Sequence, residues 1–138
     1  MKVQIVLTEE DKIEGFTTIE LKNLGVAIED ISDNKCEFIV ATKIINVLRP
    51  EQIADFINLI TSKLRRGGTL VLSGIEPKVL CKMISNDLVR EETLNNIVSQ
   101  CSSVMPMKNC LELLSTKGLQ INNASINGVE YEISAKRN

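Results

Sequence analysis

The chain has 138 residues, a mass of 15.3 kDa and a formal net charge of -2, and 43% of its residues are hydrophobic. This length predicts a single domain, residues 1–138, that buries about two thirds of the surface of its unfolded chain in one core. The slight acidity argues against nucleic-acid binding, which needs clustered Lys and Arg to displace counterions. Because only 3% of the residues are aromatic, we expect an aliphatic core.

The N-terminal third predicts several short strands. Residues 3–7 and 16–21 have the apolar pattern of strands, and the polar loop between them is too short for a full crossover helix. A third short strand is expected at residues 26–28. A further strand is expected at residues 38–41, where Ile39 and Val40 are β-branched.

Residues 51–72 combine a helix, a double glycine and a strand. Apolar residues recur at helical spacing and predict a helix over 51–64 with one buried stripe. The stripe comprises Ile53, Phe56, Ile57, Ile60 and Leu64. Gly67 or Gly68 is expected to close this helix in the left-handed conformation, and residues 69–72 then form a short buried strand. This order is typical of one half of a crossover in a parallel sheet.

The C-terminal half predicts helices followed by a hairpin. Helices are expected at residues 77–83, 91–101 and 107–117, the last of them capped by Gly118. Residues 121–126 and 130–135 read as strands around Asn127-Gly128, a dipeptide that favours a type I′ turn. The chain therefore predicts an α/β fold with six or seven strands, parallel except for an antiparallel last strand.

No metal site and no membrane contact are expected. The four cysteines form no C-x-x-C pair and the sequence has no histidine, so we expect buried, reduced thiols. Glu9, Glu10 and Asp11 lack the glycine turn and the spacing of a calcium loop. The apolar run at the N-terminus is too short for a signal peptide or a membrane span, so a cytoplasmic location is expected.

Four segments in order carry a family resemblance. They are Lys12-Ile-Glu-Gly-Phe-Thr-Thr-Ile-Glu-Leu21 and residues 37–48, 63–72 and 76–81. They resemble "K-I-x-G-F-x-N-I-D", "D-x-I-x-x-x-x-x-L-E-H", "L-K-P-G-G-x-L-x-I" and "P-D-x-x-x-L" of class I S-adenosylmethionine-dependent methyltransferases, in a branch of small chains. The resemblance implies a three-layer Rossmann-like methyltransferase fold, with a mostly parallel sheet and an antiparallel C-terminal hairpin.

The resemblance also implies two cofactor-binding candidates. In the family, an acidic residue at the end of the second strand holds the ribose hydroxyls of S-adenosylmethionine, and Glu20 stands at that position. Asp30 matches the acidic residue that lies near the adenine. Both assignments apply only if this chain binds the cofactor.

The sequence departs from the family where the chemistry would occur. The glycine-rich turn after the first strand, often "L-N-L-G-C-G", is replaced by residues 5–10, which contain no glycine. Side chains there would block the close approach of the cofactor, and Glu9 and Glu10 would repel its carboxylate. The "L-E-H" tripeptide is Ile45-Asn46-Val47, so the acid–histidine pair is lost and no catalytic residue is assigned.

Three functions are consistent with these observations. The first is a non-catalytic methyltransferase fold without cofactor that acts as a structural or protein-interaction module, as a homo-oligomer or with a protein partner, for example in a virion. The second is an active small methyltransferase that uses S-adenosylmethionine on a sugar or small metabolite. The third is a module that binds a cation or polyamine.

Residues 104–107 are apolar but show neither the helical nor the strand period. They predict either a contact surface or a turn under the last helix.

Overall fold

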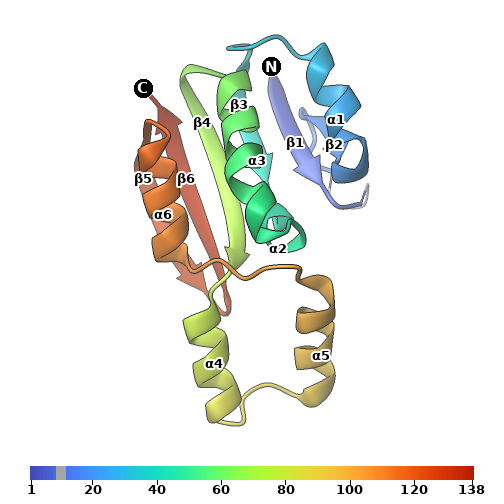
Figure 1. Cartoon of the computed structure of the whole chain (residues 1–138), viewed down its shortest axis with the longest axis vertical. Helices are drawn as coiled ribbons and strands as arrows, with labels where there is room; N and C mark the ends of the chain where they lie inside the picture. Colours follow the sequence, from blue (N-terminus) through green and yellow to red (C-terminus); the bar gives the residue numbers. More distant parts are fainter. Residues whose placement is uncertain (9–11) are drawn as a thin grey trace.

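A computed structural model describes residues 1–8 and 12–138, and these form one sheet of six strands in the order β2-β1-β3-β4-β6-β5 (Figure 1). The strands are β1 (Lys2–Val6), β2 (Thr17–Glu20), β3 (Cys36–Ala41), β4 (Leu64–Ile75), β5 (Leu119–Asn127) and β6 (Glu130–Arg137). The helices are η2 (Leu21–Asn23), α1 (Leu24–Ala27), η3 (Ile28–Asp30), α2 (Ile44–Val47), α3 (Pro50–Lys63), α4 (Pro77–Ser85), α5 (Glu91–Gln100) and α6 (Met107–Thr116).

The sheet has the predicted mixture of directions. Strands β2, β1, β3 and β4 are mutually parallel, whereas β6 is antiparallel to both of its neighbours, β4 and β5. The strand β6 therefore lies inside the sheet, between two strands that precede it in the chain. The α/β class, the parallel sheet and the antiparallel C-terminal hairpin are confirmed.

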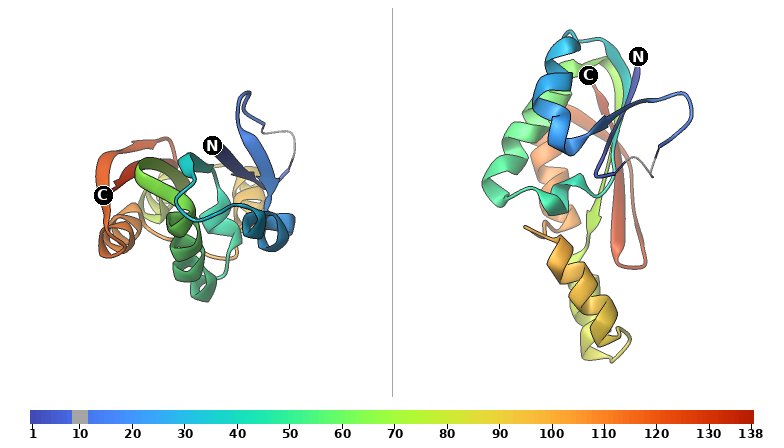
Figure 2. Two further views of the ribbon diagram at one scale, coloured as in Figure 1. Left: turned by 90° about the horizontal axis from the view of Figure 1, so that it is seen from above. Right: turned by 90° about the vertical axis from the view of Figure 1, so that its right-hand side faces the viewer.

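The helices that cover the sheet lie on one face. Figure 2 shows α1, α3 and α6 on the same side. The connections from β2 to β3, from β3 to β4 and from β4 to β5 all step across the sheet in one direction, and right-handed crossovers then place their helices on one side. Among the connections between parallel strands, only the step from β1 to β2 runs the other way, and no helix is found in its described part, residues 7–8 and 12–16. The expected third layer is thus not helical in the described part of the chain.

Burial follows this asymmetry. Ile5, Ile39 and Leu72 point to the helical side and are fully buried or nearly so. On the other face Phe38 is half-buried, and Phe16 covers it edge-on with ring centroids 5.7 Å apart. The segment after β1 therefore serves as a partial cover for the helix-free face.

One predicted strand is wrong. Residues 26–28 belong to α1 and η3, in which Leu24 and Ile28 are buried while Val26 is 77% exposed. Burial at i and i+4 with exposure at i+2 is the pattern of a helix, not of a strand. The apolar run at residues 26–28 was too short to distinguish the period of a helix from that of a strand.

The expected role of the double glycine is also wrong. The helix α3 ends at Lys63 and the chain enters β4 directly at Leu64. The register between β3 and β4 shifts in this region, where Gly67 has φ +76°. A Cβ at Gly68 would lie 2.9 Å from the carbonyl oxygen of Arg65, so the glycines form a bulge inside the strand rather than a helix cap.

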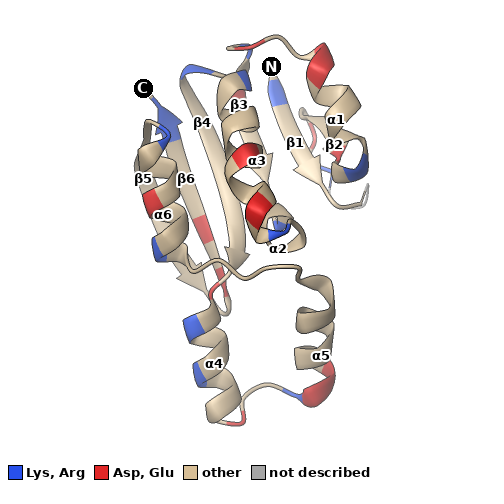
Figure 3. Cartoon of the chain, viewed as in Figure 1, with Lys and Arg blue, Asp and Glu red and all other residues tan. Residues whose placement is uncertain are grey.

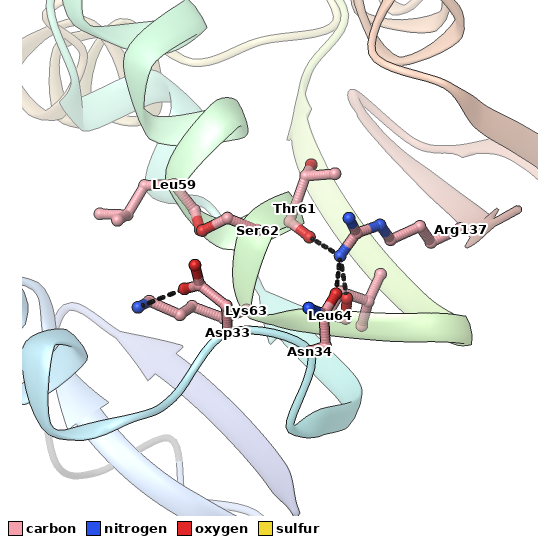
Figure 4. A network of polar contacts seen from close by, with 8 residues as sticks. All are labelled: Asp33, Asn34, Leu59, Thr61, Ser62, Lys63, Leu64 and Arg137. Atoms are coloured by element: carbon pink, nitrogen blue, oxygen red, sulfur yellow. Dashed lines mark hydrogen bonds and ion pairs between the residues drawn. The ribbon is translucent and has the colours of Figure 1, made fainter.

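Arg137 closes the end of α3 instead. Its Nη1 donates to the carbonyl oxygens of Thr61, at 2.9 Å, and of Leu64, and to Asn34 Oδ1 at 2.8 Å (Figure 4). A cation on the last carbonyls of a helix satisfies orphan acceptors and complements the helix dipole. The strand β6 is thereby tied to the C-terminus of α3.

The two C-terminal turn predictions have different outcomes. Gly118 follows α6 with φ +80° and donates to the carbonyl oxygen of Ser115, as expected of a helix cap. The hairpin turn is shifted by one residue, because Asn127 pairs with Glu130 and only Gly128 between them has positive φ. That pattern fits a type II′ turn rather than the predicted type I′ turn.

Candidate functional site

The topology leaves a crevice at the carboxyl edge of the sheet. The chain leaves β1 toward β2 on one side and leaves β3 toward β4 on the other, which makes the space between β1 and β3 a switch point. A cavity of about 290 Å³ lies at this edge, and we call it the edge cleft. Its lining residues are Leu7, Lys43, Asn46, Val47, Gly74, Ile75, Ile97, Gln100, Cys101, Val129 and Glu130.

Lys43 stands at the mouth of the edge cleft. It has φ +64°, and its backbone N–H donates to Ser73 Oγ at 3.0 Å. Its Nζ lies 3.6 Å from Glu130 Oε1, and both side chains are about half exposed. An exposed ion pair of this kind contributes about 0–1 kcal/mol, so both charged groups remain accessible to a ligand.

Asn46 is buried in the wall of the edge cleft, with 4% of its surface exposed. Its Oδ1 accepts from the backbone N–H of Ile75 at 3.0 Å, and its Nδ2 donates to the carbonyl oxygen of Ser103 at 3.2 Å. Its own carbonyl oxygen accepts from the N–H groups of Ser102 and Ser103. The residue that replaces the expected acid therefore joins the end of β4 to the segment before α6.

Glu76 joins the beginnings of two helices. It is 5% exposed and follows β4 directly. Its Oε1 accepts from the N–H of Lys78 at 3.3 Å, and its Oε2 accepts from the N–H of Met107 at 2.8 Å. A carboxylate at a helix N-terminus is favoured by the helix dipole, and here one carboxylate serves both α4 and α6.

Tyr131, in β6, binds the segment before α6 that Asn46 also contacts. Its hydroxyl donates to the carbonyl oxygen of Met105 at 2.8 Å. Burial raises the pKa of Cys110 to about 11 and raises the pKa of Tyr131 well above its usual range. Gly74 makes room for the ring, because a Cβ there would lie 2.8 Å from the Tyr131 hydroxyl oxygen.

The structure separates the two predicted cofactor residues. Glu20 ends β2 at the carboxyl edge, paired with Val6 of β1, and its carboxylate lies 3.1 Å from Lys22 Nζ. Asp30 is exposed at the far end of the helical segment, shortly before β3 begins, and so lies toward the opposite edge. The predicted contribution of Glu9 and Glu10 falls outside the described residues.

The clamp formed by Asn46, Glu76 and Tyr131 was not predicted. Glu76 carried a local signal, because an acidic residue before a proline is a common start of a helix. Tyr131 and Asn46 carried none, since their partners lie 26 and 57 residues away in the chain.

The cysteines and the apolar residues 104–107 match their sequence predictions only in part. All four thiols are free, but only Cys36 and Cys110 are buried, and Cys81 is exposed. Met105 and Met107 are half-buried and pack against the core, whereas Val104 is 44% exposed. Residues 104–106 are therefore an irregular segment that leads into α6, and Met107 is the first residue of that helix, so the predicted turn does not form.

Two further findings concern residues 1–8 and 12–138. In this part of the chain no group of three or more His, Cys, Asp and Glu side chains is placed to hold a metal ion. No helix there is both long and apolar enough to cross a membrane.

Comparison with solved structures identifies the fold. The chain is similar to an S-adenosylmethionine-dependent methyltransferase from Archaeoglobus fulgidus, with a TM-score of 0.65 and 11% identity over 96% of this chain and 74% of that one. A methyltransferase from Methanosarcina mazei gives a TM-score of 0.63 with 14% identity, over 99% of this chain and 82% of that one. Magnesium protoporphyrin IX methyltransferase from Synechocystis with bound SAH gives 0.55 with 15% identity, over 89% and 51% of the two chains.

These likenesses establish that the chain has the fold of the S-adenosylmethionine-dependent methyltransferases, as its sequence resemblance implied. No protein-family model matches the sequence, and no curated protein matches it. At 11–15% identity the likeness concerns the fold alone.

Proposed function

We propose that this chain is a non-catalytic protein of methyltransferase fold that uses its carboxyl edge as a structural joint and works through protein contacts. One observation carries the proposal. The buried polar side chains Asn46, Glu76 and Tyr131 all bind the short segment that leads into α6. In an enzyme of this fold, polar groups at the same edge would face cofactor and substrate.

The energetics of these contacts favour a joint over a ligand site. A ligand that recruited Asn46 would leave the Ile75 N–H or the Ser103 carbonyl without a partner. Leaving a buried polar group unpaired costs about 1–3 kcal/mol, which weakens ligand affinity by about 5-fold to 150-fold for each group. The hydrogen bonds therefore oppose the use of the clamp in binding.

The ionisable side chains at the edge cleft also favour a non-catalytic function. The sequence has no histidine, and among the described residues that line the edge cleft the ionisable side chains are Lys43, Cys101 and Glu130. Lys43 and Glu130 form an exposed ion pair at 3.6 Å. A general base is most effective when its pKa lies near the working pH, as that of a free histidine does, and the sequence offers no histidine for this role.

A second candidate is an S-adenosylmethionine-dependent methyltransferase, and the position of Glu20 favours it. This carboxylate stands at the end of β2 beside β1, close to the switch point, where it could hold ribose hydroxyls. If the cofactor binds, it would supply an electrophilic methyl group, and the chain would have to position the acceptor with Lys43, Glu130 and Gln100. Asp30 would take no part, because of its place near the opposite edge.

Calorimetric titration of the protein with S-adenosylmethionine and with SAH separates the two candidates. The proposal predicts a Kd weaker than about 1 mM for both compounds. Micromolar binding that Glu20→Gln weakens at least tenfold would contradict it and support the methyltransferase. Lys22→Gln is the matched control, because it removes the ion-pair partner of Glu20 and keeps the carboxylate.

A further inference from the structure

The helices α4 and α5 form an arm, residues 77–100, that projects beyond the carboxyl edge of the sheet (Figures 1 and 2). Neither helix packs extensively on the sheet or on the other helix. The arm is joined to the body mainly through Glu76 at its beginning and through the segment after α5 that Asn46 holds. It is therefore the part of the described chain with the least tertiary support.

Both helices of the arm have apolar stripes that are only partly covered. In α5, whose residues are all described, Leu94, Ile97 and Val98 lie at helical spacing, yet the helix has no buried residue. In α4, also fully described, Leu80 alone is buried. Val98 is 60% exposed and Leu88, in the link between the helices, is 68% exposed. An amphipathic helix normally buries its stripe against another element.

The two stripes border one groove. A cavity of about 180 Å³ is lined by Leu80 of α4 and by Ile97 and Val98 of α5. Ile75 and Cys101 line both this cavity and the edge cleft, so the two hollows adjoin. We call this hollow the arm groove.

The two helices of the arm carry opposite charges (Figure 3). The helix α4 contains Lys78 and Lys82 and no acidic residue, whereas α5 contains Glu91 and Glu92 in its first turn and no basic residue, with Arg90 at its N-cap. All four side chains are exposed. The arm thus presents a basic helix and a helix with an acidic first turn, next to an apolar hollow.

We propose that the arm is the docking surface for the same arm of a second copy of this chain. In the resulting dimer, α5 of each chain lies against α4 of the other, which covers the apolar stripes and brings acidic side chains to basic ones. This inference rests on the proposed function, because it names the partner and the surface of a protein that works through contacts.

Self-complementarity singles out a second copy as the occupant. In a contact with twofold symmetry, the same patch serves both partners, so every attraction occurs twice. A patch with one basic and one acidic helix meets this requirement when each helix faces the opposite helix of the partner. A foreign helix of a single charge sign would attract one wall and repel the other.

Charge reversal tests the pairing. One variant carries Lys78→Glu and Lys82→Glu, and the other carries Glu91→Lys and Glu92→Lys. Light scattering should show a concentration-dependent dimer for the wild-type chain and at least tenfold weaker association for each variant alone, because like charges then meet. An equimolar mixture of the variants should restore the dimer, since each acidic arm then meets a basic arm.

Lys108→Glu combined with Glu112→Lys on α6 is the matched control, because both residues are exposed and lie outside the arm. This variant should associate as the wild-type chain does. Circular dichroism verifies that the arm variants keep their helices, and Leu88→Ser should weaken association without any change of charge.

Several results would overturn the inference. They are a wild-type chain that stays monomeric at high concentration, a mixture that does not restore the dimer, or a dimer that the charge reversals leave unchanged. A monomer that binds an unrelated protein through the arm would also overturn it, while keeping the proposed function. Failure of the proposed function itself would appear separately, as cofactor binding in the calorimetric titration.

Discussion

Replacement of Asn46 with alanine should lower the free energy of unfolding by about 2–4 kcal/mol. The substitution removes the side-chain hydrogen bonds to Ile75 at 3.0 Å and to Ser103 at 3.2 Å. It leaves a backbone donor and a backbone acceptor without these partners, and each such loss costs about 1–3 kcal/mol. Equilibrium urea unfolding followed by circular dichroism measures the loss as a shift of the midpoint at unchanged slope.

Asn96→Ala on α5 is the control for this measurement. Asn96 is exposed in a helix interior, where alanine has the higher helix propensity, so the variant should gain up to about 0.7 kcal/mol. Asn46→Asp keeps the acceptor for Ile75 but replaces the donor to Ser103 by a carboxylate oxygen, so it should destabilise at least as much as alanine. A loss below about 0.5 kcal/mol for Asn46→Ala would refute the clamp, because ordinary surface substitutions stay within that range.

Three further predictions concern stability. Gly68→Ala should cost about 1–3 kcal/mol in thermal unfolding, because its Cβ would lie 2.9 Å from the Arg65 carbonyl oxygen, whereas Gly25→Ala has free space and should stabilise α1. Stability should fall between about pH 9 and pH 11, because the Cys110 thiol, with an ordinary pKa of 9.0, then loses its proton in the unfolded chain but keeps it in the folded one. The loss reaches about 2–3 kcal/mol in urea titrations, and Cys110→Ala should reduce the slope. Arg137→Met should cost about 1–3 kcal/mol in the same assay, because the carbonyl oxygens of Thr61 and Leu64 lose a charged donor; an unchanged midpoint would contradict this.

The elements with a clear local period could be predicted from the sequence. Four members of the apolar stripe predicted for α3, from Ile53 to Ile60, lie in that helix and are buried as expected, whereas the fifth, Leu64, is buried as the first residue of β4. The hairpin of β5 and β6 was signalled by Asn127-Gly128, although the turn itself is shifted by one residue. The order of the segments also indicated the fold, which the structural comparisons confirm.

The elements that were missed depend on distant contacts. The pattern at residues 26–28 was too short to separate helix from strand, and packing on the sheet decided between them. Gly67 and Gly68 fit a cap and a bulge equally well, and the pairing of β4 with β3 determined which one formed. The clamp at the carboxyl edge joins residues up to 57 positions apart, so no local pattern could indicate it.

The interior position of β6 has a consequence for how the protein is made. A ribosome releases β4 long before β5 and β6 are synthesised, and until then one side of β4 has no strand to pair with. Its Leu70 and Leu72, which are almost fully buried in the folded protein, then lie on an incomplete layer. Nascent chains should therefore be most prone to aggregation, and most dependent on chaperones, during the interval in which α4, α5 and α6 are translated.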